Sequence, residues 1–185
     1  MPLTLQAIND LPDDVLIDVG FLFEGNTFVG TSRGGLTFAP QIERRNIEYD
    51  GKKANVAEMD RDTFSGAQIT GTLIQFVSKL SIFEPGSTQT DPGGNVSSLI
   101  TPQTGGQLYA AGDYLTNLRL VHPTRAGGYV QVRFPVALCT QYTVSGQDRS
   151  EAEIAATFEA RLSLSDAAAT PGKKPYVIEL LDTFS

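Results

Sequence analysis

Apolar and polar residues alternate most regularly between positions 150 and 165, in the stretch SEAEIAATFEARLSLS. Every even position from Ala152 to Leu164 is apolar, and most odd positions carry polar or charged side chains. Alanine, glutamate, leucine and arginine favour helices, but a period of two residues is typical of a half-buried strand. The sequence therefore predicts a β-strand here, against the preference of its individual residues.

Shorter stretches elsewhere are rich in β-branched and aromatic residues and are bounded by turn residues, which predicts further strands. These predicted strands cover residues 17–24, 27–30, 66–77, 116–123, 128–144 (one long strand, or two joined at Pro135) and 176–184. The glycines at 127–128 predict an antiparallel pair on either side of them, and a short helix is expected within 78–86. The chain is thus expected to be mainly β, with two packed antiparallel sheets in a sandwich or barrel and one short helix.

A long charged stretch near the start of the chain, GTSRGGLTFAPQIERRNIEYDG at 30–51, has a weaker apolar pattern. A Gly-Gly pair interrupts it, an Ala-Pro step predicts a turn in its middle, and an Asp-Gly pair closes it. We expect its two limbs to pair as a long hairpin over 31–50 that projects from the domain. An isolated two-stranded ribbon is marginal in water, so this hairpin must pack on its own domain or on another subunit.

A length of 185 residues with 41% apolar content predicts a single domain over 1–185. Within it we expect an N-terminal arm at 1–16, a long loop rich in Gly, Ser, Thr and Pro at 86–106, and a C-terminal segment at 166–185. No apolar run approaches the roughly 18 residues of a membrane span, and the first residues lack the basic start of a signal peptide. The chain is expected to be soluble and made in the cytoplasm.

Residues that could support catalysis or bind a metal are few. The one histidine, His122, has no cysteine cluster to join it, and the one cysteine, Cys139, lies in an apolar run that predicts a buried thiol. The acidic stretch EMDRDT at 58–63 lacks the spacing of a calcium loop, and DPGG at 91–94 lacks the Lys-Ser/Thr of a phosphate loop. We therefore expect no enzyme activity, no metal and no cofactor. The net charge of −7 offers no basic face for nucleic acid.

The order of these parts resembles that of the major tail tube proteins of long-tailed, siphovirus-like bacteriophages. The resemblance rests on IDVGFLFEG near the start, VGTSRGGLTF at 29–38, IERRNIEYDGKKANVAEMDR at 42–61 and AQITGTLIQF at 67–76. The alternating stretch at 152–164 and the last short strand match the C-terminal half of that family more loosely. The loop at 86–106 matches no pattern of that family.

This resemblance implies a structural protein of the virion, made in the bacterial host and built into the phage tail. Copies would form hexameric rings that stack into a tube, and the genome would pass through the lumen during ejection without specific binding. The implied partners are further copies of the chain and other tail proteins, with no membrane. The residues implied in contacts between subunits lie on or near the hairpin: Arg33, Gly34, Gly35, Leu36, Phe38, Glu43, Arg44, Arg45, Glu48 and Tyr49.

Two other classes of function stay open. A β-sandwich binding module of a phage fibre or of a secreted protein could recognise a sugar or a host surface, although the chain has no tryptophan to stack on a sugar ring. A hydrolase with a scattered pair of carboxylates is the third interpretation. If the chain is a tail tube subunit, the sequence leaves open whether the tail contracts.

Overall fold

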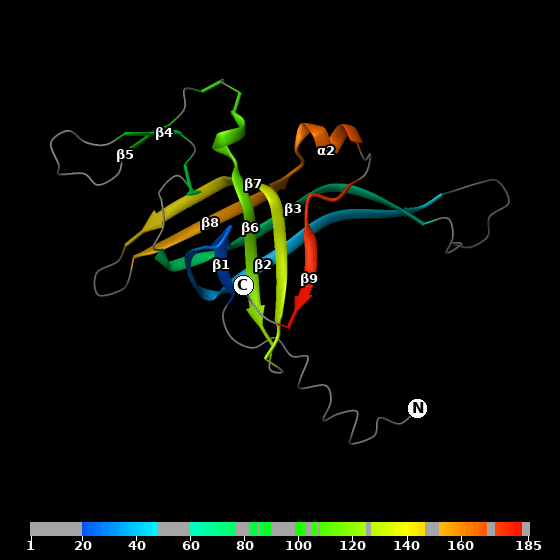
Figure 1. Cartoon of the computed structure of the whole chain (residues 1–185), viewed down its shortest axis with the longest axis horizontal. Coiled ribbons are helices and arrows are strands. Elements are labelled where there is room, and N and C mark those ends of the chain that lie inside the picture. Colours follow the sequence, from blue (N-terminus) through cyan, green and yellow to red (C-terminus); the bar gives the residue numbers. More distant parts are fainter. Residues whose placement is uncertain are drawn as a thin grey trace, which may run out of the picture.

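The structure, a computed structural model, describes residues 20–47, 60–76, 82–84, 86–89, 99–102, 105–106, 108–124, 127–146, 152–169 and 173–182. The described residues fold mainly into antiparallel strands with one short α-helix, so the mainly β fold expected from the sequence is confirmed (Figure 1). The N-terminal arm predicted at 1–16 lies outside the described residues.

The described strands run from β1 near the start of the chain to β9 near its end. They are β1 (Phe21–Glu24), β2 (Thr27–Asn46), β3 (Asp60–Phe76), β4 (Gly86–Gln89), β5 (Leu99–Pro102), β6 (Leu115–Pro123), β7 (Tyr129–Ser145), β8 (Glu153–Arg161) and β9 (Val177–Leu181). A 3-10 turn, η4 (Ala111–Asp113), precedes β6, and the α-helix, α2 (Leu164–Ala169), follows β8. The predicted antiparallel pair around the glycines at 127–128 is confirmed as β6 and β7, and β7 continues through Pro135 as one strand.

Seven strands join in one hydrogen-bonded sheet in the order β6-β1-β2-β3-β8-β7-β9, and β6 also pairs with β7. That additional pairing closes a circuit from β6 through β1, β2, β3, β8 and β7 back to β6. The expected separation into two sheets is therefore not seen in the hydrogen bonding. Instead, one sheet folds over itself, and β6 and β9 cross β2 and β3 in the view of Figure 1.

Strands β8 and β9 follow one another along the same side of β7. Arg161 at the end of β8 pairs with Val136, and Val177 at the start of β9 pairs with Arg133. The described residues between these two pairings, 162–169 and 173–176, lie outside the sheet and include α2. This interruption leaves β9 as an edge strand, and β7 is the only described strand that pairs with it.

The core lies between the crossing halves of the sheet. Burial along β8 alternates with residue number, so the alternating strand predicted for 152–164 is confirmed over Glu153–Arg161. At its ends the prediction is wrong, because Ala152 is exposed and Leu164 is 89% exposed at the start of α2. Its inward-facing residues are Ile154, Ala156, Phe158 and Ala160. Phe134 on β7 is completely buried and packs edge-on against Phe38 of β2, with 6.1 Å between the ring centroids. Strands far apart in the sequence are thereby held together by apolar side chains.

A bulge of two glycines, Gly34 and Gly35, interrupts β2, and both have positive φ angles, 75° and 88°, that favour glycine. Just after the bulge, Leu36 turns into the core opposite Gly71 of β3. A methyl group added at Gly71 would lie 2.6 Å from a terminal carbon of Leu36 and 2.9 Å from the carbonyl oxygen of Gly35. The close approach of β2 and β3 at this point therefore requires glycine.

Replacing Gly71 with alanine is expected to lower the free energy of unfolding by about 1–3 kcal/mol, because the added methyl would meet backbone that cannot rotate away. Urea denaturation followed by circular dichroism measures this change. The matched control is Gly112→Ala, whose methyl would enter open space and is expected to change stability by about 0.5 kcal/mol or less. Equal losses in the two variants would contradict this packing of Leu36.

Two local predictions are wrong. The two limbs of 31–50 do not pair with each other, because residues 31–46 form one continuous strand paired with 60–75. The loop predicted at 86–106 contains the antiparallel pair of β4 and β5. In both cases pairing with another segment decides the structure, and local turn signals do not carry that information. Most of the stretch 78–86, where a short helix is predicted, lies outside the described residues.

Candidate assembly surface

The outer half of β2 and the first half of β3 form a two-stranded ribbon, defined here as residues 40–46 and 60–67. β3 pairs with β8 only from Gln68 to Leu73, and β2 pairs with β1 only as far as Thr31. Each strand of the ribbon therefore has only the other as a described neighbour. Figure 1 shows β2 and β3 extending together beyond the other strands as a long arm.

An aromatic cluster anchors the base of the ribbon to the body of the subunit. Tyr176, immediately before β9, packs edge-on against Phe38 at 5.1 Å between centroids and contacts Phe64 at 5.9 Å. Phe38 in turn contacts the buried Phe134. These contacts fix the direction in which the ribbon leaves the body.

One face of the ribbon carries ion pairs within the subunit. Arg44 and Asp62 stand opposite one another, and Nε of Arg44 lies 3.3 Å from Oδ1 of Asp62. Nζ of Lys174 lies 3.5 Å from the other carboxylate oxygen of Asp62, and Asn46 donates a hydrogen bond of 2.6 Å to Asp60. Such exposed pairs each contribute about 0–1 kcal/mol. They nevertheless satisfy the charged groups of this face internally.

The opposite face, called the outer face here, consists of Glu43, Arg45, Ile47 and Arg61. Arg45 stands directly across from Arg61, both are exposed, and neither takes part in any ion pair among the described residues. Glu43 and Ile47 share this face because they lie two residues on either side of Arg45, and Ile47 is 38% exposed. Like charges directly opposite in a sheet are unfavourable. Within the described part of the chain, no carboxylate forms an ion pair with either arginine.

Five of the ten residues implied in subunit contacts belong to the body of the subunit. Leu36 is buried and Phe38 half-buried in its own core, while Gly34 and Gly35 form the bulge. Arg33 forms an ion pair across the sheet with a carboxylate of β8, Glu153. The inner part of the predicted hairpin thus packs on its own domain.

The other five implied residues lie at or beyond the ribbon. Glu43, Arg44 and Arg45 are exposed on it, whereas Glu48 and Tyr49 lie outside the described residues. The sequence did not single out Arg61, which is the cross-strand neighbour of Arg45. Only the register between β2 and β3 brings these two arginines together, and no sequence signal fixes that register.

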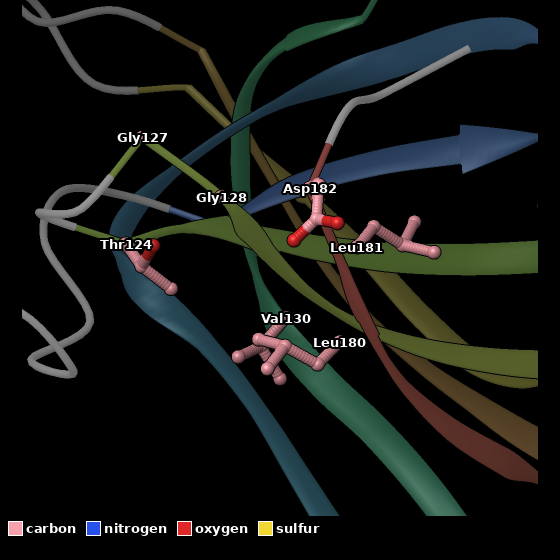
Figure 2. A pocket seen from close by; sticks show the side chains of 7 residues that line it. All are labelled: Thr124, Gly127, Gly128, Val130, Leu180, Leu181 and Asp182. Carbon is pink, nitrogen blue, oxygen red and sulfur yellow. The ribbon is translucent and has the colours of Figure 1, made fainter.

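A groove lies where β6 ends, β7 begins and β9 ends, and its volume is about 580 Å³ (Figure 2). It is lined by Thr124, Gly127, Gly128, Val130, Leu180, Leu181 and Asp182. Val130 and Leu180 are paired across the strands and supply apolar surface, with Leu180 75% exposed. Asp182 is exposed at the end of β9. The groove thus combines an apolar floor with one carboxylate.

Backbone hydrogen bonds link the described residues beside the groove. The amide of Thr124 donates to the carbonyl of Gly128 at 2.8 Å, and the amide of Gly127 donates to the carbonyl of Thr124 at 3.1 Å. A methyl group at Gly128 would lie 2.9 Å from the carbonyl oxygen of Leu181, so glycine at this position allows the close approach to β9.

His122 on β6 and Cys139 on β7 are the histidine and the cysteine weighed in the sequence for catalysis or metal binding. Among the described residues there is no cluster of His, Cys, Asp or Glu that could hold a metal. His122 is half-buried on β6, and burial lowers its pKa. Cys139 is buried, as predicted, and burial raises the pKa of its thiol to about 11.

This thiol is expected to react slowly with a disulfide reagent at pH 8 while the protein is folded, and rapidly in urea, because only the thiolate is the nucleophile. Since folding raises the pKa of Cys139, its contribution to stability is present at neutral pH and is lost as the pH rises from about 9 to 11. Labelling rates with and without urea test the prediction. Equal rates in both conditions would contradict the burial of Cys139.

No helix in the described part of the chain combines the length and apolar character that crossing a membrane requires. Comparison with models of known protein families and with curated proteins finds no match to this chain.

Proposed function

We propose that this protein is the structural subunit of a phage tail tube, in which hexameric rings stack around a channel that conducts the genome. The observation that carries the proposal is the ribbon, a long ordered arm without a core of its own. Such an arm is marginal when isolated and gains stability from a partner surface. On this proposal the protein resides in the virion and binds other copies of itself and other tail proteins.

Two unpaired strand edges support an assembly role. β9 has one described partner, and β2 has none on its outer side beyond Thr31. Exposed edges of this kind invite pairing with another chain, and neighbours in a ring would cover them. We further infer that the crossing halves of the sheet act as two packed layers in such a ring, which the contact between Phe38 and Phe134 supports.

The charge of the chain is consistent with a conduit for DNA. A net charge of −7 repels phosphates, so DNA would pass without binding. The ribbon carries both signs of charge, as expected of a surface that meets other copies of the same acidic protein. No enzyme activity is part of the proposal.

Sedimentation velocity over a concentration series tests the proposal. The expected result is a sedimenting mass that rises steeply with concentration from the 19.9 kDa subunit to large assemblies. A constant subunit mass at all concentrations would overturn the proposal. It would favour the alternative of a β-sandwich binding module, which has no need to associate with itself.

A further inference from the structure

We propose that the outer face of the ribbon docks into the groove of a second copy of this chain, with Arg45 and Arg61 on the carboxylate of Asp182. Ile47, on the same face, lies on the apolar floor of the groove. The inference rests on the proposed function, because it names the two surfaces through which copies join.

Charge complementarity favours a second copy as the occupant. The two guanidinium groups stand opposite one another without a described counter-ion, and a carboxylate placed between them would accept hydrogen bonds from both. Asp182 is exposed at the rim of the groove and has no described ion-pair partner. Arg133, at the other end of the pairing between β7 and β9, is already paired with Glu179.

The apolar parts of the two surfaces also correspond. The groove offers Val130 and Leu180 beside its carboxylate, and the outer face offers Ile47 beside its arginines. A volume of about 580 Å³ is ample for one aliphatic side chain with the arginine stems next to it. Both surfaces thus combine an apolar area with charge, and the two arginines of the outer face outnumber its one carboxylate, Glu43.

The contact would be heterologous, because the ribbon and the groove are different surfaces of one subunit. Figure 1 shows the arm of β2 and β3 directed away from the ends of β6 and β9, where the groove lies. A contact between different patches leaves a free ribbon and a free groove after every joining step. It therefore builds closed rings or open filaments rather than dimers.

A charge-swap experiment on the full chain tests the inference. The double variant Arg45→Glu/Arg61→Glu and the single variant Asp182→Lys are each expected to raise the concentration for half-maximal assembly about tenfold or more. Combining all three substitutions in one chain is expected to restore assembly to within about threefold of the wild type, because the attraction returns with reversed signs. Light scattering during a concentration series gives the readout.

Arg44→Gln is the matched control, because Arg44 is on the same ribbon but faces its own Asp62. It is expected to change the assembly concentration by about twofold or less. Circular dichroism and urea denaturation of every variant establish that each one is folded. Failure of the combined variant to recover while its parts remain folded would overturn the inference.

Cross-linking gives a second readout, which reports which residues lie close together in the contact. Separately purified Arg61→Cys and Asp182→Cys chains, mixed under mild oxidation, are expected to form a disulfide dimer between unlike chains. Arg44→Cys mixed with Asp182→Cys is expected to give little of it. Equal cross-linking in both mixtures would contradict the assignment of the outer face.

The failure of this inference can be distinguished from failure of the proposed function. If the wild type assembles but the charge variants assemble equally well, the tube proposal stands and the docking inference is wrong. If the wild type does not associate at any concentration, both are wrong.

Discussion

Replacing Phe134 with alanine is expected to destabilise the subunit by about 3–5 kcal/mol, a loss typical of a large aromatic removed from a core. Phe134 is completely buried, pairs with Leu118 across β6 and β7, and contacts Phe38 from the other half of the sheet. Total stabilities of domains are about 5–15 kcal/mol, so this single change would remove a large share of the stability. Urea denaturation of dilute protein measures the loss.

Tyr109→Ala is the control for that substitution. It removes an aromatic ring that is 44% exposed and whose described ring contact is with Tyr114. A loss of about 1 kcal/mol or less is expected, because little apolar area leaves the interior. Losses of similar size in the two variants would contradict a core centred between the crossing halves of the sheet.

Shortening the ribbon is expected to abolish assembly and to leave the subunit folded. In the variant, Asn-Gly replaces residues 43–63 and joins Ile42 to Phe64, which are already opposite one another. Phe64 keeps its contact with Tyr176. The lost ion pairs are exposed, and a shorter loop costs less entropy to close, so a stability change of about 2 kcal/mol or less is expected. Circular dichroism and sedimentation velocity measure folding and assembly separately.

A broader deletion of residues 33–48 serves as the contrast. It removes Leu36 and Phe38 from the core together with most of β2, so this variant is expected to unfold. If the short deletion also unfolds the subunit, the ribbon belongs to the folding unit and the proposed assembly surface is wrong. If the short deletion still assembles like the wild type, the ribbon is not the joining surface.

The sequence was sufficient to predict a strand and its buried side where the pattern along that one strand decides burial. Within 152–164 the alternation predicted β8 and its buried side over Glu153–Arg161, because one face of that strand meets the core and the other does not. It failed at Leu164, which belongs to α2 and is exposed. The buried thiol of Cys139 was predicted for the same reason, since it lies in an apolar run that faces the interior. Predictions of burial from such local patterns do not depend on which strands become neighbours.

Pairing between distant strands could not be predicted. The 31–50 stretch contains turn residues, but β2 continues through them because β3 offers a partner along nearly its whole length. The glycine pair that suggested an end to the strand forms a bulge within it, and Pro40 lies on a strand whose outer side is unpaired. The opposition of Arg45 and Arg61 follows from the same register and was therefore missed.

Negative-stain electron microscopy of the purified chain, with averaging of end-on and side views, tests the central claim most directly. The expected result is hollow tubes with regularly spaced rings in side view and six subunits around an open centre in end view. Globular particles of subunit size at the highest concentration, with no rings or tubes, would contradict it.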